Sequence, residues 1–289
     1  MDQDMFDNEY NTNAFGGIWT YQKLVALKKY LSAFTTALKE KPFKLIYLDG
    51  FAGTGSCDIK IKGEGERKII EGSATIALNT KPPFDHYYFI ELASRKQSAL
   101  RRLVKENTDR NVDILDGDCN QALIKICETE EWKRARAVLF LDPYGFQVDW
   151  TTLKAIANTK AIDMWYLFPY SGLYRQAPKD VDALDSDKEA AINRILGTDE
   201  WRQQFYRPSP QGDMFGKEGE VRGSHQDMLD FVTNRLKQIF PCVLDPAVLY
   251  QGNNSSGAPL FALYFAVSNP NQQARTVATR IAKHILRAP

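Results

Sequence analysis

The segment 49–55, with the sequence DGFAGTG, has residue types that suit a ligand-binding loop. It follows the apolar run 43–48, which predicts a β-strand. Gly53 and Gly55 carry no Cβ atom, so the backbone there can pass close to a ligand. Asp49, at the end of the strand, can accept a hydrogen bond from an amine or a ribose hydroxyl. Open α/β sheets bind ligands at the carboxyl ends of their strands, so we expect a binding site here.

The residues after the glycines exclude two kinds of phosphate-binding loop. A P-loop ends in Gly-Lys-Ser/Thr, whereas Gly55 is followed by Ser56 and Cys57. A dinucleotide motif would place its third glycine at Asp58, and a carboxylate there would repel a pyrophosphate. The remaining interpretation is a ligand without phosphates, and S-adenosylmethionine is such a ligand. The alternative is a tight glycine turn that binds nothing.

The spacing of the acid and the glycines resembles a known cofactor motif. Asp49, Phe51, Gly53 and Gly55 match the pattern D/E-x-F/G-x-G-x-G of class I S-adenosylmethionine-dependent methyltransferases. The resemblance implies that these four residues bind S-adenosyl-L-methionine.

A second acid follows the next predicted strand. Glu91 ends the apolar run 87–90, where nucleotide sites place a carboxylate that binds ribose hydroxyls. The distance from the first loop is long for one βα unit. Apolar and charged residues alternate over 57–71, which predicts an inserted β-hairpin that accounts for the extra length.

The third predicted strand, 112–115, is followed by further polar residues. In the methyltransferase pattern an acid here reaches the adenine amino group, and Asp118, with Cys119 beside it, is the residue that we assign to this role. Asp116 is interpreted as a turn residue. For any single acid the alternative is a helix N-cap or a solvated strand end.

The fourth predicted strand, 137–141, leads into Asp142-Pro143-Tyr144-Gly145-Phe146. This segment resembles the (D/N)PP(Y/F) motif of amino-methyltransferases. The resemblance implies that Asp142 and the Pro143 carbonyl accept hydrogen bonds from a target amine, while an aromatic ring stacks on an extruded base. Tyr144 replaces the second proline, so the aromatic residue comes one position early, and Phe146 is another candidate. The alternative is an Asp-Pro turn with two core aromatics.

Five apolar runs alternate with helical patterns, which predicts a parallel sheet with helices on both faces. Two further runs, 243–249 and 260–267, predict an antiparallel edge pair. We therefore expect a Rossmann-like class I methyltransferase sheet over 19–289, after a loosely ordered segment 1–18. Residues 171–223 are polar and rich in turn residues, which predicts a lid or partner-binding insertion. Its aromatic residues either stack on bases or pack in the core; they are Trp201, Phe205 and Tyr206.

The bulk composition limits the partners. The formal net charge is +1, so nucleic-acid binding does not follow from overall charge, although basic residues gather locally. The four cysteines form no CxxC pair, so we expect no metal site and reduced thiols in the cytoplasm. The N-terminal residues lack the apolar core of a signal peptide, and no apolar run is long enough for a bilayer.

Most of residues 19–170 resemble the three-Cys-motif partner proteins. The resemblance is carried by segments 45–55, 72–78, 140–148 and 155–169. It implies a methyltransferase-like fold and a partner protein with three cysteines. The expected function is methyl transfer from S-adenosylmethionine to a nucleobase nitrogen of DNA or RNA. The alternatives are a non-catalytic partner subunit and a small-molecule methyltransferase.

Overall fold

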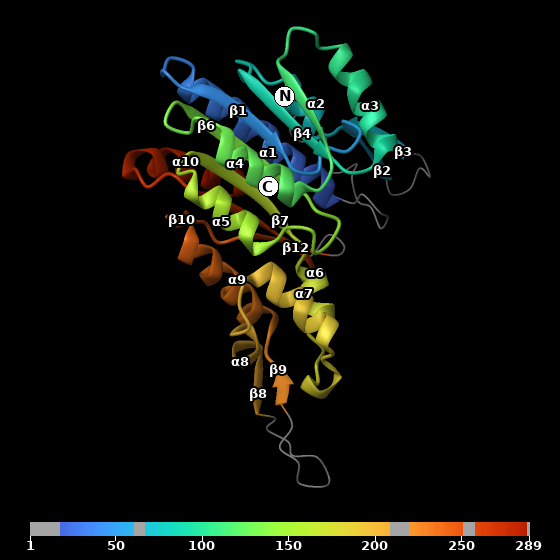
Figure 1. Ribbon diagram of the computed structural model, residues 1–289. Helices are drawn as coiled ribbons and strands as arrows, with labels where there is room; N and C mark the ends of the chain where they lie inside the picture. The colour runs from blue at the N-terminus through green and yellow to red at the C-terminus, as the bar shows by residue number, and fades with distance from the viewer. Residues whose placement is uncertain (1–17, 61–66, 209–219, 251–257, 288–289) are drawn as a thin grey trace.

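The computed structural model describes residues 18–60, 67–208, 220–250 and 258–287, and its centre is one twisted sheet (Figure 1). The strand order is β10-β12-β7-β6-β1-β4-β5, and β11 also pairs with β12. The parallel strands are β1 (Lys44–Asp49), β4 (His86–Glu91), β5 (Val112–Asp116), β6 (Ala135–Leu141) and β7 (Ile162–Phe168). The antiparallel strands are β10 (Cys242–Val243), β11 (Ala247–Tyr250) and β12 (Pro259–Val267). This is the sheet of the class I methyltransferase fold, as the sequence predicts.

Helices cover both faces of the sheet (Figure 1). One face packs against α4 (Cys119–Thr129) and α5 (Trp150–Asn158). The other packs against α1 (Ile18–Leu38), α2 (Ser73–Leu78), α3 (Ser94–Lys105) and α10 (Gln272–Arg287). Strands buried on both faces have near-continuous apolar sequences, and every residue of β7 is buried.

The last strands differ from the prediction in one respect. The run 243–249 was predicted to be a single strand, but it is broken between β10 and β11 at residues 244–246. Pro246 lacks a backbone N–H and cannot donate to a ladder, which explains the interruption. The two pieces pair antiparallel with β12, which itself lies beside β7.

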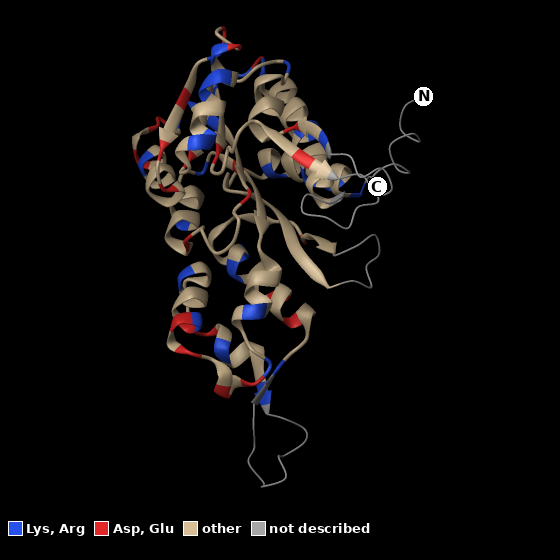
Figure 2. Ribbon diagram, turned by 90° about the vertical axis from the view of Figure 1, so that its right-hand side faces the viewer, with Lys and Arg blue, Asp and Glu red and all other residues tan. Residues whose placement is uncertain are grey.

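Residues 170–208 and 220–239 form a mostly helical unit at one end of the sheet (Figure 1). It contains α6 (Tyr170–Gln176), a short 3₁₀ turn (Val181–Ala183), α7 (Ser186–Leu196), α8 (Trp201–Phe205), β8 (Tyr206–Pro208), β9 (Glu220–Arg222) and α9 (His225–Ile239). Trp201, Phe205 and Tyr206 are buried, so they are core residues and not base-stacking residues. Acidic and basic residues are mixed over this unit (Figure 2).

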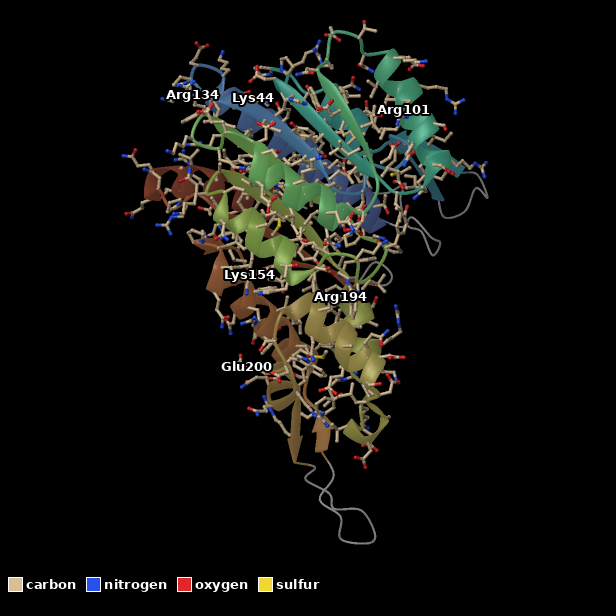
Figure 3. The ribbon with its side chains drawn as sticks, viewed as in Figure 1. Lys44, Arg101, Arg134, Lys154, Arg194 and Glu200 are labelled. Atoms are coloured by element: carbon tan, nitrogen blue, oxygen red, sulfur yellow. The ribbon has the colours of Figure 1, made fainter. Side chains whose placement is uncertain are left out.

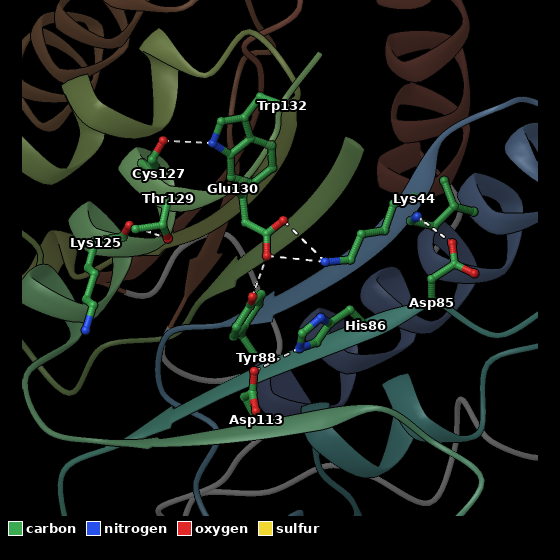
Figure 4. Close-up of polar contacts among 11 residues, drawn as sticks. Lys44, Asp85, His86, Tyr88, Asp113, Lys125, Cys127, Thr129, Glu130 and Trp132 are labelled. Carbon is green, nitrogen blue, oxygen red and sulfur yellow. Dashed lines mark hydrogen bonds and ion pairs between the residues drawn. The ribbon is translucent and has the colours of Figure 1, made fainter. Parts of the chain in front are cut away.

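A polar network joins three strands to the end of α4 (Figure 4). Both carboxylate oxygens of Glu130 lie 3.3 Å from the Lys44 ammonium, and the Tyr88 hydroxyl donates to Oε1. Next to it, His86 Nε2 lies 3.0 Å from Asp113 Oδ2 on β5. These contacts cross-link β1, β4 and β5 far from the loops at the carboxyl ends.

Within the described ranges, no helix combines the length and the apolar character that crossing a membrane requires.

Candidate cofactor site

Asp49, whose side chain is fully buried, fixes the segment after β1 by hydrogen bonds. Its Oδ1 accepts from the Phe51 N–H at 3.2 Å, and its Oδ2 accepts from the Tyr47 hydroxyl at 3.1 Å. Burial raises the pKa of Asp49 from 3.8 to about 6, although hydrogen bonds from Ser73, Phe51 and Tyr47 favour the ionised form. Asp49 therefore fixes the conformation of the loop through hydrogen bonds. It is not one of the residues that line the neighbouring pocket.

Gly50 lies where the loop passes between two buried side chains. A Cβ atom there would be 2.6 Å from Leu141 Cδ2 and 2.9 Å from Cys119 Sγ, so only glycine fits without displacement. Gly53 and Gly55 have positive φ angles of 65° and 84°, which other residues rarely adopt. The Gly53 N–H donates to Glu91 Oε2 at 3.0 Å, so this glycine connects the first loop to the second strand end.

The glycine loop leads into a strand and not into a helix. The strands β2 (Ser56–Lys60) and β3 (Arg67–Glu71) pair antiparallel over the segment in which the sequence predicts a hairpin, and residues 61–66 lie outside the described residues. The Gly72 N–H then donates to the Gly55 carbonyl at 2.8 Å, and α2 begins immediately afterwards. Phosphate sites of nucleotide-binding sheets use the N-terminus of the helix that follows the loop directly. That arrangement is missing here, in agreement with a ligand that lacks phosphates.

Glu91 is buried at the end of β4, and both of its carboxylate oxygens are oriented by the backbone. Oε2 accepts from Gly53, and Oε1 accepts from the Ala93 N–H at 2.8 Å. A carboxylate has about four acceptor positions, so each oxygen can still accept a hydroxyl. Glu91 is thus fixed in place and retains the capacity to bind a diol.

Asp118 has two roles in the structure. Its Oδ1 caps α4 by accepting from the N–H groups of Asn120 and Gln121, at 2.9 and 3.1 Å. The same residue lines the pocket, as does Cys119, whose thiol pKa is raised by burial. The N-cap alternative is correct for Asp118, and it holds the carboxylate at the pocket edge. Asp116, in contrast, pairs with Arg101 at 2.9 Å and is not among the lining residues.

These strand ends surround a pocket of about 650 Å³, which is a usual volume for a small-molecule or cofactor site. Its lining residues are Gly50, Phe51, Glu91, Leu92, Ala93, Lys96, Gly117, Asp118, Cys119, Asn120, Tyr144, Phe146, Gln147, Asp149 and Arg194. Four of the predicted cofactor residues are among them, namely Phe51, Glu91, Asp118 and Cys119. The other three, Asp49, Gly53 and Gly55, do not line the pocket; they lie in the segment that contains Phe51 and determine its backbone conformation.

The three predicted catalytic residues after β6 have different environments, because Tyr144 lines the pocket and Asp142 and Pro143 do not. Tyr144 lines the pocket with 82% of its surface exposed. Lys96 Nζ lies 3.0 Å from the Tyr144 hydroxyl and 4.4 Å from the centroid of its ring, so these two lining side chains contact each other. Pro143 is buried, and Asp142 forms an ion pair with Lys23 of α1 outside the pocket lining.

Two polar contacts fix this segment in position. The Tyr144 N–H donates to Gln147 Oε1 at 2.8 Å, and Asn120 of α4 donates to the Gln147 carbonyl at 2.8 Å. Arg194 extends from α7 toward this segment (Figure 3). It forms an ion pair with Asp149 and donates to the Phe146 carbonyl at 2.7 Å. The helical unit therefore contributes directly to the pocket wall.

Several lining residues belong to no motif in the sequence, including Leu92, Lys96 and Arg194. Lys96 and Arg194 are surface-type residues on helices, and no local pattern distinguishes them from solvated charges. Leu92 could have been found, because it directly follows the acid at the second strand end. Among the described residues, no group of three or more His, Cys, Asp or Glu side chains is placed to hold a metal ion.

Fold and site together define a domain of class I methyltransferase architecture with a pocket at the carboxyl ends of β1, β4, β5 and β6. No protein-family model matches the sequence, and no curated protein matches it. Similar folds occur among solved structures. Protein LPL1258 from Legionella pneumophila, described by the family model DUF519, is 14% identical, with 90% of each chain covered and a TM-score of 0.51.

Two methyltransferase structures are more distantly similar. The DszA carbon methyltransferase is 12% identical over 89% of this chain and 56% of its own, with a TM-score of 0.43. An rRNA methylase from Streptococcus thermophilus is 11% identical over 86% of this chain and 96% of its own, with a TM-score of 0.31. At these identities the likeness concerns the fold alone.

Proposed function

We propose that this chain is an S-adenosylmethionine-dependent methyltransferase that acts on a nucleobase nitrogen of DNA or RNA. The observation that carries the proposal is the convergence of Glu91 and Asp118 on one pocket beneath a glycine loop that lacks a phosphate site. The residues present fit an adenosine group without phosphates.

Each part of the pocket has a chemical counterpart in the cofactor. Glu91, held by two backbone N–H groups, accepts hydrogen bonds from the ribose hydroxyls. Asp118 accepts from the adenine amino group, while Leu92 and Phe146 provide apolar surface. When bound, S-adenosylmethionine supplies an activated methyl group.

The segment after β6 is proposed to bind the acceptor. Asp142 and the Pro143 carbonyl accept hydrogen bonds from the target amine and hold its lone pair toward the methyl group. Tyr144 stacks on the base, a contact worth about 1–3 kcal/mol per base. Its 82% exposure suits this role, because an exposed ring can take up a partner without any loss of core packing. Catalysis then rests mainly on proximity and orientation.

The resemblance to three-Cys-motif partner proteins extends the proposal to a protein partner. We place the reaction in the cytoplasm, with nucleic acid as substrate and a three-cysteine protein as an associated subunit. A role as a purely structural subunit is not favoured, because the pocket is open and its acids are oriented by hydrogen bonds.

Incubation with methyl-labelled S-adenosylmethionine tests the proposal. The purified chain is mixed with total RNA, denatured genomic DNA and a protein extract, and label is followed into each fraction. We expect label in a nucleic-acid fraction, its loss in Asp142→Ala, and its retention in the control Asp116→Ala. Label in no fraction, or an active Asp142→Ala variant, contradicts the proposed chemistry.

A further inference from the structure

Lys23 is a buried lysine whose position the cofactor motifs do not explain. It is 9% exposed, and within the described ranges it is the only Lys or Arg that is buried. Its ammonium forms an ion pair with Asp142 Oδ2. Burying an ammonium is strongly unfavourable unless the charge is paired, so this position needs a reason.

The pair lies at the meeting point of two central strands. In the sheet register Asp49 of β1 is opposite Phe140 of β6, two residues before Asp142, so both carboxylates end at the same edge. Their charges interact, because Asp142 contributes to the raised pKa of Asp49. The same charges act on Cys57 of β2: burial raises the pKa of its thiol, and the ammonium of Lys23 lowers it.

The charges of this cluster leave one negative charge at neutral pH. Asp49, with a pKa of about 6, is mostly ionised near pH 7. The ammonium of Lys23 offsets the charge of Asp142. Asp49, which is buried behind the loop and outside the pocket lining, is therefore the carboxylate of this cluster whose charge no ammonium offsets.

We propose that Lys23 is a positioning residue at the methyl-transfer end of the site, where it orients Asp142 and offsets its charge. This inference rests on the proposed function. The ion pair uses Oδ2 of Asp142, which leaves Oδ1 as the oxygen that would accept the N–H of the acceptor in the proposed reaction. Without Lys23, Asp142 would be an uncompensated anion at this edge of the sheet, and it would favour cationic ligands over neutral ones.

Two cofactor analogues measure this charge without knowledge of the acceptor. S-adenosylhomocysteine is neutral at its sulfur, whereas sinefungin carries an amine in place of the methylsulfonium group. Calorimetry gives the dissociation constant of each for the wild-type chain, Lys23→Met, Asp142→Asn and Lys23→Arg. The ratio of the two constants reports the local charge, and general damage to the pocket weakens both ligands alike.

The two neutralising variants are expected to shift the ratio in opposite directions. Lys23→Met favours sinefungin over S-adenosylhomocysteine by roughly tenfold relative to wild type, because loss of the positive charge leaves a net attraction for the amine and changes nothing for the neutral sulfur. Asp142→Asn disfavours sinefungin by a similar factor, and Lys23→Arg keeps the ratio within about twofold. If Lys23→Met does not fold, Lys23→Gln takes its place.

The outcomes separate this inference from the proposed function. A wild-type chain that binds neither analogue overturns the proposed function, and the role of Lys23 with it. A wild-type chain that binds both, with the same ratio in Lys23→Met and Asp142→Asn, overturns the role of Lys23 alone.

Discussion

Asp49→Asn should make the protein more stable near neutral pH and weaken cofactor binding. The native carboxyl has a pKa of about 6, against 3.8 for an ordinary aspartate. Between these values the folded protein binds more protons than the unfolded chain, so stability falls as pH rises. The difference corresponds to about 3 kcal/mol, absent below pH 3.8 and complete above about pH 6. An asparagine is neutral throughout and escapes this loss.

Urea unfolding followed by circular dichroism at about pH 4 and about pH 7.5 measures the effect. Relative to wild type, Asp49→Asn should gain up to about 3 kcal/mol between the two pH values, and the cost of its altered hydrogen bonds to Tyr47 and Phe51 is the same at both. The control Asp116→Asn, at an exposed strand end, should show no such gain. The same difference between Asp49→Asn and wild type at both pH values would refute the reasoning.

The binding arm of this prediction has the opposite sign. Asp49 accepts the N–H of Phe51 and so fixes the loop whose Phe51 lines the pocket, and its substitution should weaken S-adenosylmethionine binding by about tenfold at pH 7.5. A variant that is more stable but binds less well indicates that the buried charge is kept for function.

Three other substitutions test the packing and the site. Gly197→Ala should cost at least about 2 kcal/mol in the free energy of unfolding by urea, because Gly197 has φ +66° and an added Cβ would lie 1.9 Å from Trp150 Cδ1. Its control, Gly145→Ala, should be nearly neutral, because no atom lies within 4 Å of a Cβ added there. Tyr88→Phe should lower the melting temperature and cost about 1–3 kcal/mol in the free energy of unfolding, because the half-buried Glu130 carboxylate loses a donor. Tyr144→Ala should leave stability within about 0.5 kcal/mol while methyl transfer to nucleic acid falls at least about tenfold; unchanged transfer would remove the stacking role.

The central sheet was predictable because its strands are buried on both faces. The predicted strands 87–90, 112–115 and 137–141 lie within β4, β5 and β6, and the alternation over 57–71 coincides with the antiparallel strands β2 and β3. The packing of Trp201 and Phe205 in the core agrees with one of the two alternatives drawn from the sequence. The break at Pro246 and the short helix α6 were missed. This helix is short, and packing of its aromatic residues against the core determines it more than local periodicity does.

The candidate site was predictable at its strand ends and not elsewhere. Glu91 and Asp118 follow apolar runs, so topology alone brings them to one edge of the sheet. Lys23 and Arg194 come from helices distant in the sequence. Their contribution depends on how α1 and α7 pack, which no local spacing reveals.

Calorimetric titration with S-adenosylhomocysteine tests the central claim most directly, because the claim is that the pocket binds the adenosine group of the cofactor. The wild-type chain and Asp116→Ala should bind with a stoichiometry near one, whereas Asp118→Ala should bind about tenfold more weakly after loss of one hydrogen bond to the adenine. Absence of binding to the wild-type chain, or equal affinity in Asp118→Ala, would contradict the assignment.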